Sequence, residues 1–85
     1  MPIISMFLGI IIYMRFNEHL PPHFLAKYQG QEAAFTLDGE ILSGSIPPRQ
    51  QKFVRAWIEL HQDELAANWE VAREHGELFR IDPLR

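Results

Sequence analysis

Hydrophobic and polar residues alternate through the first half of the chain with the period of two that is typical of β-strands. Two glycine-containing pairs, Gln29-Gly30 and Asp38-Gly39, separate the apolar runs. Such pairs favour tight hairpin turns of type I′, in which both central residues need positive φ. The pattern therefore predicts a four-stranded antiparallel meander with strands near residues 9–16, 22–28, 31–37 and 40–46.

The two turns determine which side chains share a face of this sheet. If both close hairpins, Phe24 faces Phe35, which in turn faces Leu42. This face is apolar and is predicted to be the core face, with Phe24, Ala26, Ala33, Phe35, Leu37 and Leu42. Ile41 then falls on the opposite face. The first strand is expected to add Ile10, Ile12, Met14 and Phe16 to the core, because the other register would bury Arg15 without a partner.

Apolar residues after Pro48 recur with the period of an α-helix. Proline suits a first helical turn, so a helix is expected to begin here. The apolar stripe is compatible with one helix of about 27 residues. Two helices, 48–61 and 63–75, are favoured because a single long helix would overhang so small a sheet. Asp63 is the expected N-cap of the second helix and Gly76 its C-cap.

The predicted fold is therefore of the α+β class, with the meander followed by two C-terminal helices packed on one face of the sheet. Residues 77–85 are expected to form an extended tail docked on the body, and residues 1–85 a single domain. The apolar start of the chain is interpreted as a buried strand preceded by a short leader. It lacks the basic start of a signal peptide and is shorter than a membrane span of about 20 residues, so no membrane partner is predicted.

Composition and charge narrow the classes of function. The 85 residues include no cysteine, which excludes disulfides, thiolate metal sites and cysteine nucleophiles and fits a cytoplasmic location. Residues 1–57 carry five basic and four acidic side chains, whereas residues 58–85 carry three basic and seven acidic ones. Proteins that bind duplex DNA usually show a basic surplus. A DNA-binding repressor is therefore disfavoured.

The second face of the sheet is expected to bring together Tyr13, Arg15, His23 and Lys27. An imidazole can act as general acid or base near neutral pH, and cationic side chains stabilise charge that develops on a phosphate. A tyrosine can stack on a base. The set would suit metal-independent cleavage of RNA. The alternative is an ordinary polar sheet face, on which Lys27 pairs with Glu32.

Other polar residues give weaker signals. His19 and His23 have the spacing of a helical metal pair, but Pro21 and Pro22 forbid that helix, so no metal site is predicted. No cofactor is predicted either, because no phosphate loop or dinucleotide motif is present. His61 is expected in the core or at its boundary, and Glu64 in solvent.

The first helix carries three basic residues on its polar side. Cations in a first turn oppose the helix dipole, which hints at an anion or a partner there. The candidate binding residues are Arg49, Lys52 and Arg55.

Three segments, "PPHFLAKY", "DGEILSGSIP" and "WIELHQDELAANWEVA", resemble the bacterial domain of unknown function 4160 family. The resemblance extends from about Ile3 to Leu84. It implies a toxin–antitoxin-like module in which the partner is a small protein of the 2442 family of unknown function. Such modules often contain a compact metal-independent ribonuclease. The family pattern reads His-Phe-His where this chain has Leu25 after His23 and Phe24, and this substitution weakens the case for catalysis.

The leading hypothesis is a cytoplasmic bacterial protein that acts by pairing with a cognate small protein. The surface used would be an exposed sheet edge or the face with Tyr13, Arg15, His23 and Lys27. The alternative is a ribonuclease toxin that acts on RNA or at the ribosome through the same face. An open sheet edge would also allow a homodimer.

Overall fold

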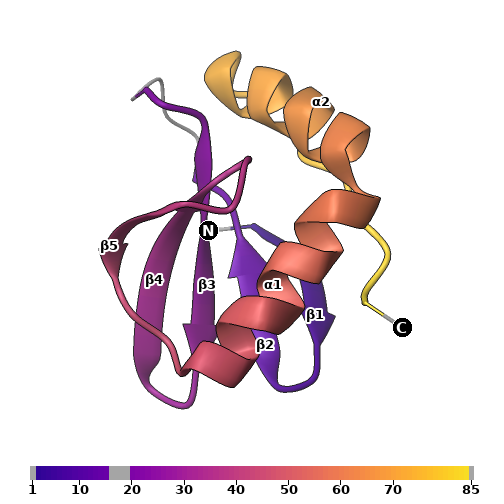
Figure 1. The fold of residues 1–85 in the computed structure, drawn as a ribbon. Helices are drawn as coiled ribbons and strands as arrows, with labels where there is room; N and C mark the ends of the chain where they lie inside the picture. Colours follow the sequence, from indigo (N-terminus) through magenta and orange to yellow (C-terminus); the bar gives the residue numbers. More distant parts are fainter. Residues whose placement is uncertain (1, 16–19, 85) are drawn as a thin grey trace.

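The computed structural model describes residues 2–15 and 20–84. Its centre is an antiparallel sheet with the strand order β1-β2-β3-β4-β5 (Figure 1). Two helices follow, α1 (Pro48–Leu60) and α2 (Gln62–Arg73). The α+β class is as predicted. The strands are β1 (Ile3–Phe7), β2 (Ile10–Tyr13), β3 (His23–Tyr28), β4 (Gln31–Thr36) and β5 (Ile41–Gly44).

The prediction of four strands was wrong, because the expected leader is itself an edge strand. β1 pairs with β2 through a tight turn at Leu8 and Gly9, whose φ angles are 50° and 79°. Turns with two positive φ angles normally carry Asn, Asp or Gly at both central positions. A leucine at the first position hid this turn from the sequence pattern.

The hairpin between β3 and β4 is as predicted. Gln29 and Gly30 both have positive φ, and the register pairs Phe24 with Phe35. On the neighbouring strand, Ile10, Ile12 and Met14 are fully buried in the core, as the predicted register requires.

The turn between β4 and β5 is one residue longer than predicted. Only Gly39 has positive φ, and the hairpin closes with the Thr36 N–H donating to the Glu40 carbonyl at 2.8 Å. This geometry is a three-residue loop with a residue in the left-handed region, not a two-residue type I′ turn. The register therefore pairs Phe35 with Ile41, which packs against the core. Leu42, predicted to be in the core, is 45% exposed.

The two helices separate at His61, so the two-helix prediction was correct. The observed caps of α2 lie one or two residues away from the predicted ones. His61, not Asp63, is the N-cap of α2, and it makes no side-chain capping hydrogen bond. At the other end His75 has φ +56°, and the Gly76 N–H donates to the Val71 carbonyl at 2.9 Å. This is a Schellman arrangement in which histidine takes the usual place of glycine.

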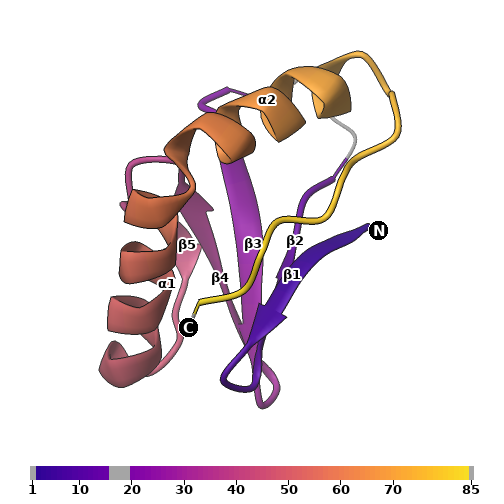
Figure 2. The same cartoon turned by 90° about the vertical axis from the view of Figure 1, so that its right-hand side faces the viewer.

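The helical layer lies on one side of the sheet (Figure 2). α1 runs along the sheet, and α2 crosses the end at which β3 begins. Trp57 of α1 is fully buried, with its ring 5.4 Å from Phe7 and 5.7 Å from Phe24. The predicted apolar stripe of the helices thus forms the core with the sheet.

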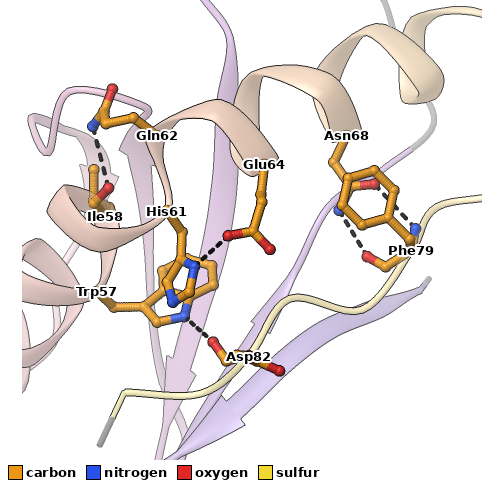
Figure 3. Close-up of polar contacts among 8 residues, drawn as sticks. All are labelled: Trp57, Ile58, His61, Gln62, Glu64, Asn68, Phe79 and Asp82. Carbon is orange, nitrogen blue, oxygen red and sulfur yellow. Dashed lines mark hydrogen bonds and ion pairs between the residues drawn. The ribbon is translucent and has the colours of Figure 1, made fainter.

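Residues 77–84 contain neither helix nor strand and run from the end of α2 back toward β1 (Figure 2). The Ile81 N–H donates to the Ile4 carbonyl at 2.7 Å. The Trp57 indole N–H donates to the Asp82 carbonyl at 2.8 Å (Figure 3). Fully buried Asn68 donates to the Phe79 carbonyl at 2.8 Å and accepts from the Phe79 N–H at 3.0 Å. The side-chain amide of Asn68 therefore gives the Phe79 backbone the two hydrogen bonds that a neighbouring strand would otherwise give.

Asn68→Ala is expected to lower the free energy of unfolding by about 2–3 kcal/mol, because two partly buried backbone groups of Phe79 lose their partner. Urea unfolding measures this value. Gln62→Ala is the control, since Gln62 also donates to two carbonyls but is exposed; it should cost less than about 1 kcal/mol. Equal losses for the two variants would contradict this role of Asn68.

Ser5 of β1 carries a buried hydroxyl that has no hydrogen-bond partner among the residues the structure describes. It lies beside the irregularity in register between Ile3 and Ser5 and is 1% exposed. Ser5→Ala should therefore raise the free energy of unfolding by about 1 kcal/mol, because the cost of burying the hydroxyl disappears. Thermal unfolding beside Ser43→Ala, at an exposed position of β5, tests this. A loss of stability in Ser5→Ala would show that the hydroxyl is satisfied.

Candidate functional site

The face of the sheet opposite α1 is the candidate site, and neither helix lies over it (Figures 1 and 2). We call it the open face. Its members follow from strand alternation and the observed register, in which Ile3 pairs with Tyr13, and Tyr13 with Leu25. They are Ile3, Met6, Ile11, Tyr13, His23, Leu25, Lys27, Glu32, Ala34, Thr36 and Ser43.

The open face is apolar over β1, β2 and the middle of β3 and β4. Ile3 and Met6 are 39% and 51% exposed. Tyr13 and Ala34 are each 7% exposed although neither helix lies over this face. The sheet thus presents large aliphatic side chains to solvent around a tyrosine.

Tyr13 and Lys27, two of the predicted site residues, line one shallow cavity on the open face. The cavity has a volume of about 280 Å³, and Ile3 and Ile11 complete its lining. Lys27 is exposed and lies opposite Glu32, but the two form no ion pair in the part of the chain that the structure describes. Arg15 is exposed and follows the end of β2. The cavity is lined mainly by apolar side chains, with one cation at its border.

His23 lies at the start of β3 and contacts the helical layer. Its ring is 5.5 Å from that of Trp69, and its Nδ1 lies 2.8 Å from the Pro21 carbonyl oxygen. Because a carbonyl can only accept, Nδ1 carries the proton, which leaves Nε2 as the basic nitrogen of the neutral ring. Four residues of strand separate His23 from Lys27, which is about 13 Å at 3.3 Å per residue. The two side chains do not converge on one small group.

A comparison with protein-family models matched one family, described as "Domain of unknown function (DUF4160)", over residues 9–70. The chain belongs to this family. The matched segment contains β2 to β5, α1 and most of α2, so β1 and the docked tail lie outside it. No curated protein and no solved structure matched the chain.

The three basic residues of α1 that were predicted to bind a ligand lie in different surroundings in this DUF4160 protein. The Arg49 guanidinium lies 5.6 Å from the centre of the Phe53 ring. The Arg55 Nε–H donates to the Gly39 carbonyl at 3.0 Å, which ties α1 to the loop between β4 and β5. Lys52 is exposed. Arg55 thus has a structural contact, while the predicted binding role of the three residues stays a prediction.

A second cavity, which sequence reasoning missed, lies at the end of the sheet where β3 begins and β4 ends. Its volume is about 440 Å³, and it borders the open face at Thr36. The pairing of His23 with Thr36 brings the double proline beside the loop between β4 and β5. The Pro-Pro pair predicts a break in any helix and the Asp-Gly pair predicts a turn, but neither predicts a cavity. The lining residues are Pro21, Pro22, Thr36, Leu37, Asp38, Glu40 and Leu42.

His61 pairs with a carboxylate that was expected in solvent. Its Nδ1 lies 2.6 Å from Glu64 Oε1, and its ring is 5.6 Å from the centre of the Trp57 ring (Figure 3). The His61 side chain is 12% exposed, which agrees with its predicted place at the boundary of the core. The spacing of three residues across the start of α2 is the sequence signal for this contact. The pair links the helix junction to the buried tryptophan.

The described residues contain no group of three or more His, Asp or Glu side chains that could hold a metal ion. The paired-histidine idea cannot be followed further, because His19 lies outside the described residues. No helix within residues 2–15 and 20–84 is long and apolar enough to cross a membrane.

Proposed function

We propose that this DUF4160 protein acts by pairing with a cognate small protein through its open face, within a toxin–antitoxin-like module. The supporting observation is the apolar character of a sheet face that neither helix covers, with Ile3 39% and Met6 51% exposed. The family resemblance supplies the kind of partner, a small protein of the 2442 family, which is commonly encoded beside proteins of this family.

The strand sequences support an interface on this face. An antiparallel sheet with one face in water normally alternates apolar and polar residues. β1 and β2 read "IISMF" and "IIIY" and are apolar on both faces, as in strands that are covered on both sides. Tyrosine and methionine, which are enriched in protein interfaces, occupy this face at Tyr13 and Met6. An apolar surface rimmed by charged residues is typical of an interaction site.

The open face suits this role better than the sheet edges do. β5 has only four residues, a bulge opposite Ala34 and Phe35, and Gly44 at positive φ. Short, bulged edge strands resist the addition of another strand. At the other edge the tail already bonds to Ile4 of β1. A homodimer through an open edge has correspondingly less support.

The ribonuclease alternative has weaker support from the geometry. A metal-independent ribonuclease needs its acid, base and charge stabilisers around one phosphate. His23 lies against Trp69, and Lys27 is about 13 Å along the strand. This alternative would gain support if the purified protein cleaved RNA and a correctly folded His23→Ala variant did not.

Co-expression with the small protein encoded beside it tests the proposal. Size-exclusion chromatography with light scattering should show a stable complex for the wild type. Ile3→Lys should weaken the complex at least about tenfold, since a charge would be buried in an apolar interface next to Lys27. Leu60→Lys is the matched control, because Leu60 is 66% exposed on α1, and this variant should bind like the wild type.

Two results would contradict the proposal. One is a wild-type protein that stays monomeric in the presence of the neighbouring protein. The other is a complex that forms equally well with Ile3→Lys and with Leu60→Lys. Circular dichroism of both variants confirms that each is folded before binding is compared.

A further inference from the structure

We propose that the cavity at the end of the open face receives an arginine side chain of the partner. We call this cavity the Pro-Pro pocket; it is lined by Pro21, Pro22, Thr36, Leu37, Asp38, Glu40 and Leu42. The inference rests on the proposed function, because it specifies the chemistry of the partner that pairs with the open face.

The loop that carries the two acids is held in place by Thr36. The Thr36 hydroxyl oxygen accepts the N–H groups of Asp38 at 3.2 Å and of Glu40 at 3.0 Å. The Arg55 side chain fixes the same loop from α1 through the Gly39 carbonyl. The backbone that presents the carboxylates is therefore ordered before any partner arrives, which reduces the entropy lost on binding.

Both carboxylates are available to a ligand. Asp38 and Glu40 are exposed and form no ion pair with any residue that the structure describes. Arg55 does bond this loop, but it donates to the Gly39 backbone carbonyl and not to either acid. The residues that line the pocket thus include two acids that form no ion pair with a described residue, beside apolar residues.

The walls fit the stem and the head of an arginine. Pro21, Pro22 and Leu42 supply rigid or branched apolar surface. Arginine packs its methylene groups on such surface, and its planar guanidinium binds carboxylates in a bidentate manner. A volume of about 440 Å³ lies within the range of specific ligand sites, about 300–1,000 Å³.

Charge complementarity favours a protein segment over RNA at this site. Two carboxylates at the border of the pocket repel a phosphate backbone. At the other end of the open face Lys27 lies opposite Glu32, so that region is close to neutral. Among the described residues, Asp38 and Glu40 therefore favour a cationic group of the partner in the Pro-Pro pocket.

NMR titration of the isotope-labelled protein tests the inference without the cognate partner. The probe is acetyl-Leu-Arg-Leu-amide, and its control is the same peptide with uncharged citrulline in place of arginine. The arginine peptide should shift the amides of residues 36–42, with the citrulline peptide binding about tenfold more weakly. The double variant Asp38→Asn/Glu40→Gln should lose the same factor of about ten.

Glu59→Gln is the matched variant, since Glu59 is exposed on α1 and lies outside the pocket; it should bind the arginine peptide like the wild type. Equal binding of the two peptides, or no shift of residues 36–42 up to about 10 mM peptide, would overturn the inference. Peptide binding without a complex between the two whole proteins would instead reject the proposed function and leave the pocket in place.

Discussion

Replacing Trp57 by alanine is expected to lower the free energy of unfolding by about 4–5 kcal/mol, the upper part of the range for removing a buried tryptophan. The side chain is fully buried, packs against Phe7 and Phe24, and donates to the Asp82 carbonyl. It thus joins the sheet, α1 and the tail. Because a domain of this size has a stability of about 4–13 kcal/mol, this loss would remove from about a third to all of it.

Urea unfolding followed by circular dichroism measures this loss. Trp57→Phe keeps an aromatic ring in the core but removes the indole N–H, so it should cost about 1–3 kcal/mol through the unpaired Asp82 carbonyl and imperfect packing. A loss below about 2 kcal/mol for Trp57→Ala would mean that Trp57 is not the centre of the core.

Gly44→Ala is the second large effect, with an expected loss of about 3 kcal/mol or more. Gly44 has φ +70°, a conformation that disfavours a side chain. A methyl group there would also overlap the Glu32 carbonyl oxygen of β4 and would lie 3.3 Å from Ala33 Cα. Both atoms belong to the backbone of the neighbouring strand, so relief requires β5 to move away.

Gly30→Ala separates the two causes. Gly30 has φ +83°, but a methyl group there would meet nothing within 4 Å. It should therefore cost only the backbone strain, about 1–2 kcal/mol. Chemical denaturation of both variants gives the difference. Equal losses would show that the contact with β4 contributes nothing, contrary to the observed register.

Local signals predicted the parts of the fold that depend on neighbours in the sequence. Gln29-Gly30 gave the hairpin between β3 and β4, and helical spacing gave the buried stripe of α1 and α2. The turn at Leu8 was not predictable in this way, because its positive φ is imposed by the pairing of β1 with β2. The loop before Glu40 has one residue more than predicted. As a result Ile41, and not Leu42, pairs with Phe35 on the core face, and Leu42 is exposed.

The candidate site was predictable only in part, for a similar reason. Strand alternation placed Tyr13 and Lys27 on one face, and both line the same cavity. The apolar character of that face depends on Ile3 and Met6, which belong to β1, a strand that the sequence pattern does not predict. His23 contacts Trp69, which comes from the distant helix α2. Contacts of that kind arise from tertiary packing and leave no periodic signal.

Methyl NMR of the complex with the neighbouring small protein tests the central claim, pairing through the open face, most directly. The account predicts that the methyl signals of Ile3, Met6, Ile11 and Leu25 shift or broaden on binding, while that of Leu60 on α1 stays unchanged. Binding that perturbs Leu60 and leaves the four open-face signals unchanged would place the interface on the helical layer and contradict the account.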